Sequence, residues 1–105
     1  MHADIAEKRP ELMALCRRYD VARLEVFGSA ARGGDFKPGR SDADFLVEFK
    51  PESRLPPLER FFGLADALEQ LLGRPVDLVE RKALEQSRNY IRRRSILKDA
   101  TVVYG

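Results

Sequence analysis

The stretch VFGSAARGGDFKPGRSDADFLVEF, residues 26–49, decides how the rest of the chain is interpreted. One apolar run ends at Gly28, a loop rich in glycine and proline follows, and Asp42 and Asp44 open a second apolar run. We interpret both runs as strands. Because residues two apart on a strand project from the same side, the two carboxylates would lie together and face the Gly-Ser turn that ends the first strand. This arrangement suits a metal ion held beside a polyphosphate.

Length and composition indicate a single soluble globular domain over residues 1–105, with 44% apolar and 34% charged residues. The apolar runs are too short to cross a bilayer and the first residues carry no secretion signal, so we expect a cytoplasmic protein without a membrane anchor. The single cysteine, Cys16, excludes an internal disulfide and fits a reducing compartment, and we predict that it is a small core residue. The net charge of +2 is too small to indicate polyanion binding by itself.

Hydrophobic periodicity predicts an α/β (α+β) fold, with a small mixed β-sheet, helices packed mainly on one face and the site at the exposed edge of the sheet. Pro10 would interrupt the first helix, and Gly73 is placed to cap the second. The expected strands cover residues 22–28, 42–49, 75–80 and 101–104, and the expected helices cover residues 4–19, 58–72 and 83–98.

The sequence also predicts which faces of two elements are buried. On the strand over 42–49, one face packs on helices and the other carries acids: Ala43, Phe45, Val47 and Phe49 against Asp42, Asp44 and Glu48. On the helix over 58–72, the apolar stripe would consist of Leu58, Phe61, Phe62, Ala65, Leu68 and Leu72.

A third carboxylate, Asp77, lies within Val-Asp-Leu-Val on the strand predicted over 75–80. Carboxylates from two strands suit nucleotidyl transfer, because that chemistry builds charge on phosphate oxygens and depends mostly on positioning and on cations. Magnesium prefers oxygen ligands, and two ions could activate the attacking hydroxyl and hold the triphosphate. The alternative is structural: Asp42 and Asp44 could begin a solvated strand, and Asp77 could be an acid on an edge strand.

Ser29, directly after the turn glycine, could stand near the N-cap of a short helix that continues to Arg32. Free backbone N–H groups and a hydroxyl at that place form an anion site for phosphate oxygens.

Three segments together carry a family resemblance: GSAARG over 28–33, SDADFLV over 41–47 and VDLV over 76–79. They resemble the polymerase-β-type nucleotidyltransferase superfamily and, more narrowly, the minimal nucleotidyltransferases (MNT) that accompany HEPN-domain proteins in prokaryotic toxin–antitoxin pairs. The resemblance spans nearly the whole chain. Departures at Ala43 and Phe45, where larger aliphatic residues are usual, change packing and leave the acidic positions intact.

The resemblance implies a role for each residue of the site. Gly28 and Ser29 would contact the triphosphate of ATP, and Asp42 and Asp44 would bind two Mg²⁺ ions. Arg32 would be a candidate contact of the same phosphates, with a surface salt bridge as the equal alternative. Asp77 would complete the site, either by helping to bind the ion that activates the acceptor hydroxyl or by acting as its base.

The resemblance also implies an activity: transfer of AMP from ATP to a tyrosine of a HEPN-family toxin, with this chain as the antitoxin. Because the chain is short, it leaves little room for a pocket that binds the nucleotide base. We therefore expect a hetero-oligomer in which the partner completes the substrate site. Two alternatives stay open, namely a binding module that neutralises its partner without catalysis, and transfer of a nucleotide to a small molecule or an RNA end.

The last quarter of the chain holds a basic stretch from Arg81 to Lys98. It could form a solvated helix face or a surface for a nucleic acid or a partner protein. Because Tyr90 is the one aromatic residue in this stretch, binding of single-stranded nucleic acid by stacking is poorly supported, and direct nucleic-acid binding is not expected.

Overall fold

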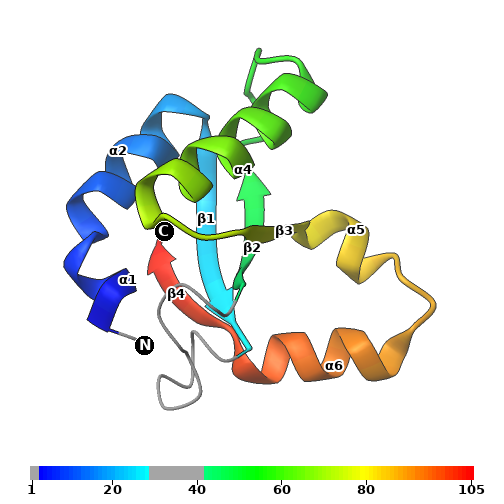
Figure 1. The fold of residues 1–105 in the computed structure, drawn as a ribbon. Helices are drawn as coiled ribbons and strands as arrows, with labels where there is room; N and C mark the ends of the chain where they lie inside the picture. Colours follow the sequence, from blue (N-terminus) through cyan, green and yellow to red (C-terminus); the bar gives the residue numbers. More distant parts are fainter. Residues whose placement is uncertain (1–2, 29–41) are drawn as a thin grey trace.

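Strands β3-β2-β1-β4, in that order, form one mixed sheet in a computed structural model that describes residues 3–28 and 42–105 (Figure 1). β1 pairs antiparallel with β2 and β4, whereas β2 and β3 run parallel, so β3 and β4 are the edges of the sheet. The strands cover Val21–Phe27 (β1), Ala43–Phe49 (β2), Val76–Glu80 (β3) and Thr101–Tyr104 (β4).

Helices lie on both faces of this sheet, but most of the helical residues cover one face. They are α1 (Ala3–Glu7), α2 (Arg9–Arg18), α4 (Pro57–Leu72), α5 (Arg81–Glu85) and α6 (Tyr90–Asp99). The main core lies between the sheet and α1, α2 and α4, and includes Leu12, Leu24, Phe45, Leu64 and Leu68. On the other face, Phe27 and Leu46 meet Leu84 of α5 and Ile96 of α6. The predicted α/β fold with helices mainly on one face is confirmed.

Proline and glycine set the helix boundaries as the sequence predicts. Pro10 lies in the first turn of α2, where its missing N–H costs no hydrogen bond, and the chain turns at Lys8 between α1 and α2. Gly73 ends α4 in the left-handed conformation (φ 66°), and its N–H donates to the Glu69 carbonyl at 2.8 Å. Within the described ranges, every helix is too short or too polar to traverse a bilayer.

The helix predicted over 83–98 is wrong as a single element, because the chain leaves helical geometry between α5 and α6. Two polar side chains stabilise the break. The Ser87 hydroxyl accepts from the Asn89 N–H at 3.2 Å, and the Asn89 side chain caps α6 by accepting from the Arg92 N–H at 3.1 Å. Such side chains compete with helical hydrogen bonding, so they favour a turn followed by a new helix start.

The apolar stripe predicted for α4 is wrong at its first turns. Leu64, which the predicted stripe omits, is fully buried together with Leu68, whereas Leu58 and Phe62 are 72% and 62% exposed. The four-residue spacing of Leu64 and Leu68 aims one side of α4 at the sheet, and Leu58 and Phe62 lie away from it. On β2 the buried face is as predicted: Ala43, Phe45, Val47 and Phe49 are all buried.

A buried carboxylate, Glu25 on β1, anchors the start of α5 to the centre of the sheet. The Arg81 guanidinium donates to the Glu25 carboxylate, and the Arg23 side chain lies 3.1 Å from the same carboxylate. Glu48 and Glu85 lie 3.9 Å and 3.7 Å from Arg81. The side chain of Glu25 is only 4% exposed, so its charge depends on these partners.

Glu25→Gln is expected to lower the free energy of unfolding by about 2 kcal/mol, because it leaves Arg81 without its closest anion in a mostly buried place. Urea unfolding followed by circular dichroism measures the change. The matched control is Glu48→Gln, whose side chain is 52% exposed and which should cost less than about 0.5 kcal/mol. Equal losses for the two variants would contradict a special role for the buried carboxylate.

Cys16 is fully buried on α2, and burial raises the pKa of its thiol to about 12. Because the thiolate is the nucleophile, the native protein should not react with iodoacetamide at about pH 8, while the urea-unfolded protein should be fully alkylated. Intact-mass spectrometry after a timed reaction shows the difference. Alkylation of the native protein at the unfolded rate would contradict this burial.

Candidate active site

The parallel pairing of β2 and β3 brings together two of the three predicted carboxylates. Asp44 of β2 is in register with Asp77 of β3, so both side chains project from the same face of neighbouring strands. That face is opposite to the one on which Phe45 and Leu78 join the main core. Asp42 stands immediately before β2 and is exposed to solvent. The predicted grouping of acids from two strands is therefore present at the edge of the sheet.

Gly28 lies against one of these carboxylates. It follows Phe27, which pairs with Asp44 across the antiparallel β1–β2 ladder, and it has a left-handed φ of 67°. A Cβ atom at this position would lie 2.7 Å from Asp44 Oδ2. Glycine therefore meets two requirements here, since it tolerates the backbone conformation and leaves space beside the carboxylate.

The electrostatics of the group centre on Asp44. Partial burial and then the charges of Asp77 and Asp42 raise the pKa of the Asp44 carboxyl to about 6, while the Arg92 guanidinium acts in the opposite direction. Like charges that lie together are stabilised by a bound cation. The site is thus an anionic cluster, and among the described residues Arg92 is the cation whose charge acts on Asp44.

Arg92 is a residue of this site that the sequence did not single out. Ile96 of α6 packs on Phe27 and Leu46, on the same face of the sheet as Asp44. Arg92 lies one helical turn before Ile96 on the same side of α6, and its charge acts on Asp44. The four-residue spacing of Arg92 and Ile96 is the sequence signal, and it requires knowing that Ile96 faces inward.

The remaining cations of the predicted basic stretch divide by role. Arg81 belongs to the Glu25 ion pair. The Arg93 guanidinium donates to the carbonyl oxygen of Ser87 at 2.9 Å, which ties the start of α6 to the preceding turn. No single role therefore describes the whole stretch. Arg81 supports the fold, Arg93 supports a turn and Arg92 lies near the site.

Ser29 and Arg32, which the sequence predicts as triphosphate contacts, lie outside the described residues. Their assignment stays a prediction.

The donor set fits Mg²⁺ in chemistry. Within residues 3–28 and 42–105, no group of three or more histidine, cysteine or acidic side chains is arranged to hold a metal ion by itself. Magnesium ordinarily takes one or two carboxylates and completes its six oxygen ligands with water and substrate phosphates. Partial burial is the main cause of the raised pKa of Asp44, and the repulsion from Asp77 and Asp42 that adds to it would be relieved by such a cation. One or two of Asp42, Asp44 and Asp77 would therefore suit a magnesium ion whose remaining oxygen ligands come from water and the nucleotide.

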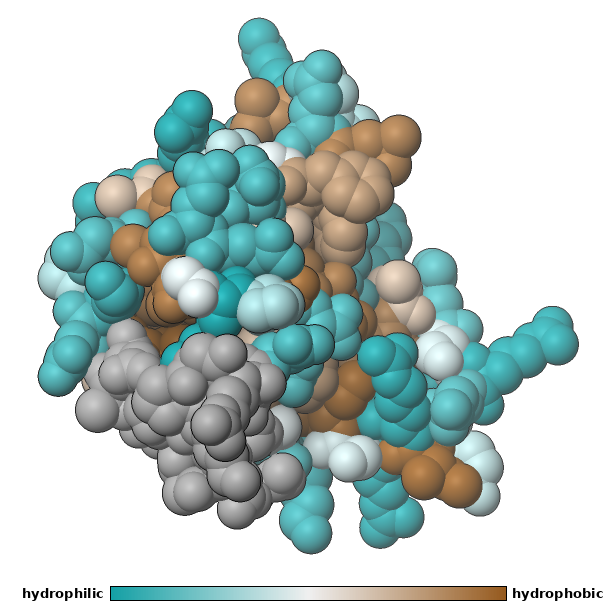
Figure 2. Space-filling view, viewed as in Figure 1, coloured by the Kyte–Doolittle hydropathy of each residue, from teal (hydrophilic) through white to brown (hydrophobic). Residues whose placement is uncertain are grey.

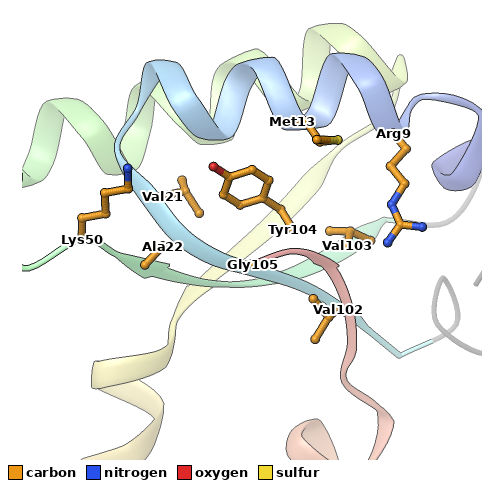
Figure 3. A pocket seen from close by; sticks show the side chains of 9 residues that line it. All are labelled: Arg9, Met13, Val21, Ala22, Lys50, Val102, Val103, Tyr104 and Gly105. Atoms are coloured by element: carbon orange, nitrogen blue, oxygen red, sulfur yellow. The ribbon is translucent and has the colours of Figure 1, made fainter.

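A separate hollow of about 440 Å³ lies beside the other edge strand, β4 (Figure 3). Arg9 and Met13 of α2, Lys50 and the Tyr104 ring line it, and Figure 3 shows the ring of Tyr104 among the other lining side chains. Among the described residues, none of the four predicted for the site lines this hollow: Gly28, Asp42, Asp44 and Asp77. The candidate active site is therefore the group around Asp44 and Asp77 and not this hollow.

Comparisons with known proteins identify the family of this chain. The family model of the nucleotidyltransferase domain matches residues 12–103. The protein adenylyltransferase MntA of Thermococcus cleftensis is 41% identical over 68% of this chain and 67% of its own length. A Methanocaldococcus jannaschii protein, provisionally named a protein adenylyltransferase, is 38% identical over 78% of this chain and 76% of its own length. A second such protein of that organism is 37% identical, and the match spans 64% of its length.

Solved structures show the same fold. A structure provisionally described as a minimal nucleotidyltransferase superposes with a TM-score of 0.70 and 32% identity, over 96% of this chain and 95% of that chain. A toxin–antitoxin structure with AMP-PNP superposes with a TM-score of 0.65 over 92% of this chain and 73% of that chain, and at 21% identity it supports the fold alone. The chain belongs to the nucleotidyltransferase domain family, and its relatives are minimal nucleotidyltransferases, as the sequence motifs predict.

Proposed function

We propose that this chain is a Mg²⁺-dependent antitoxin that transfers AMP from ATP to a tyrosine of a HEPN-domain toxin. The observation that carries the proposal is the register of β2 and β3, which places Asp44 beside Asp77 with Gly28 packed against Asp44. Relatives named protein adenylyltransferase support the chemistry. A related fold is described as an MNT antitoxin in complex with the tri-AMPylated HEPN toxin of Shewanella oneidensis, and this supports the choice of partner.

In the proposed reaction, the tyrosine Oη attacks the α-phosphorus of ATP. The Oη–P bond forms, the bond between the α-phosphorus and the bridging oxygen breaks, and pyrophosphate leaves. Asp77, which is exposed on the edge strand, would accept the phenol proton or help to bind the ion that activates the phenol. Asp42 and Asp44 would hold two Mg²⁺ ions, which supply charge stabilisation for the phosphates and lower the pKa of the attacking hydroxyl.

The proposal extends to the setting of the reaction. Residues 1–105 would act as one minimal domain in the cytoplasm, and the toxin would form a hetero-oligomer with it and complete the site around the base and the acceptor. A single buried cysteine is compatible with that reducing compartment.

The experiment that tests the proposal is intact-mass spectrometry of a HEPN-domain protein from the same genome, incubated with this chain, ATP and Mg²⁺. One or more added AMP masses, absent with Asp42→Asn, would establish both the chemistry and the acceptor class. A stable complex without added mass would favour neutralisation by contact alone. If the two proteins form no complex and the partner gains no mass, the search would turn to small-molecule or RNA acceptors.

Arg92→Gln is expected to weaken the binding of MgATP by about tenfold, because its exposed guanidinium is near enough to act on the charge of Asp44, beside which the triphosphate would lie. AMP, which lacks the outer phosphates, should lose little affinity. Isothermal titration with a non-hydrolysable ATP analogue and with AMP separates the two. Arg94→Gln, an exposed arginine on the same helix, is the matched control and should bind both nucleotides normally. Equal effects of the two substitutions would remove Arg92 from the site.

A further inference from the structure

An apolar groove runs along the edge of the sheet between α4 and β3. Two adjoining hollows of about 520 and 420 Å³ form it, and they share Phe61, Phe62 and Leu78. Figure 2 shows apolar atoms gathered on the surface over the first turns of α4, where Leu58 and Phe62 are largely exposed. The rings of Phe61 and Phe62 meet edge to face with centroids 5.3 Å apart, which holds this wall in place. Exposed apolar surface of this kind marks a place where another molecule packs.

The charged residues that line the groove are all acidic. Asp66, Glu69 and Asp77 line one hollow and Glu80 lines the other. Among the described residues, no lysine or arginine lines either hollow. The groove is thus complementary to a segment that combines apolar side chains with basic ones.

The backbone of β3 offers hydrogen bonds along this groove. The Ala43 N–H donates to the Pro75 carbonyl at 3.0 Å, so in the parallel ladder the backbone of Asp77 also turns toward β2 and that of Leu78 turns outward. The Val76 N–H, which also points outward, already has an acceptor, because it donates to the Glu69 side chain at 3.1 Å. The N–H and C=O of Leu78 are therefore the groups that an added strand would meet first.

Alternation of side chains then fixes what such a strand would present on each face. A residue opposite Leu78 shares its face and enters the groove beside Phe61 and Phe62. A residue opposite Asp77 projects from the other face, where Asp44 stands in register with Asp77. A tyrosine at that place would therefore meet the carboxylates while both of its neighbours are in the groove.

We propose that the edge of β3 and the α4 groove bind an extended segment of the acceptor protein in which the target tyrosine has an apolar residue on each side and then a lysine or arginine, which shares the tyrosine's face beside Asp77. Backbone pairing with Leu78 gives affinity, and the two apolar neighbours set the register that delivers the tyrosine. The proposal rests on the function proposed above and adds the acceptor's local sequence pattern and conformation. It also explains why Leu58 and Phe62 are exposed in the free protein.

The test titrates ¹⁵N-labelled protein with the peptide acetyl-Lys-Ile-Tyr-Ile-Lys-amide and follows the amide resonances. The expected result is binding with a dissociation constant of about 1 mM or tighter, with shifts concentrated in 58–66 and 76–80. The peptide acetyl-Lys-Tyr-Ile-Ile-Lys-amide has the same composition, but its adjacent isoleucines cannot share one face, so it should bind at least about tenfold more weakly. Equal binding of the two peptides, shifts located elsewhere or no shifts would overturn the proposal.

A pair of surface variants provides the second arm. Phe62→Ser should weaken binding of the first peptide at least about tenfold, whereas Ile91→Ser, which removes a side chain of similar exposure from α6, should not change it. Both residues are exposed, so both variants should fold. A Mg²⁺ complex of a non-hydrolysable ATP analogue, added to the same sample, should shift resonances of 27–28 and 42–44. Loss of that response alone would count against the proposed function, and loss of the peptide response alone would count against the docking groove.

Discussion

Asp44→Asn is expected to reduce nucleotidyl transfer by about 10³-fold or more and, without metal, to make the protein more resistant to urea. Activity should fall because the neutral amide is a poor Mg²⁺ ligand, and cations supply most of the stabilisation of the charge that builds on the phosphates. Rates of AMP incorporation at saturating ATP and Mg²⁺ measure the loss. The control is Glu52→Gln, which removes an exposed carboxylate from a turn and should keep full activity. More than about one tenth of the activity in Asp44→Asn would contradict the proposed metal site.

The stability gain in the same variant follows from the sign of the pKa shift. The folded state raises the pKa of Asp44 from 3.8 to about 6, so ionisation opposes folding, and stability falls as the pH rises between those values. Asp44→Asn should therefore gain about 1 kcal/mol near pH 7.5, after allowance for a carboxylate that is only half buried, and nothing near pH 4. Urea unfolding at the two pH values, with chelator present, tests this. A loss of stability at the higher pH would show that Asp44 has a partner that stabilises its charge.

The sequence alone predicts much of this site, because its signals are local. The alternation of apolar and acidic residues along 43–49 identifies the buried face and the acidic face of the strand. Gly28 marks the turn that leaves space beside the Asp44 carboxylate. The pairing of Asp44 with Asp77 on neighbouring strands is different. It depends on β3 pairing in parallel with β2 at one particular register, and neither residue's neighbours in the sequence encode that pairing. The resemblance to a known family supplied it.

The sequence does not predict two features of the surface, for a related reason. Arg92 lies on a helix whose exposed residues include Tyr90 and Ile91, so periodicity does not reveal which side faces the sheet. Leu58 and Phe62 have the composition of a core stripe, and nothing local separates an apolar side chain that packs inside the chain from one that packs on another molecule. The omission of Arg92 and the wrong burial predicted for Leu58 and Phe62 both concern surfaces where the chain is proposed to bind its ligands.

Gly28→Ala is expected to lower nucleotidyl transfer by about 10²-fold or more, through the position of one carboxylate. The added Cβ would stand 2.7 Å from Asp44 Oδ2, so the carboxylate or the turn must move. Displacement of a catalytic group by about 1 Å is enough for such a loss. The variant should also lose about 1–2 kcal/mol of stability, because alanine is strained at a φ of 67°.

Gly73→Ala separates these two effects, because Gly73 has nearly the same φ of 66° at the end of α4 and no atom within 4 Å of the added Cβ. The two variants should therefore lose similar stability in urea unfolding, while only Gly28→Ala loses activity when both are assayed well below their melting temperatures. If both lost activity in parallel, the cause would be the weakened fold. If neither did, the close approach of Gly28 to Asp44 would have no part in the chemistry, and the need for glycine at this turn would be conformational alone.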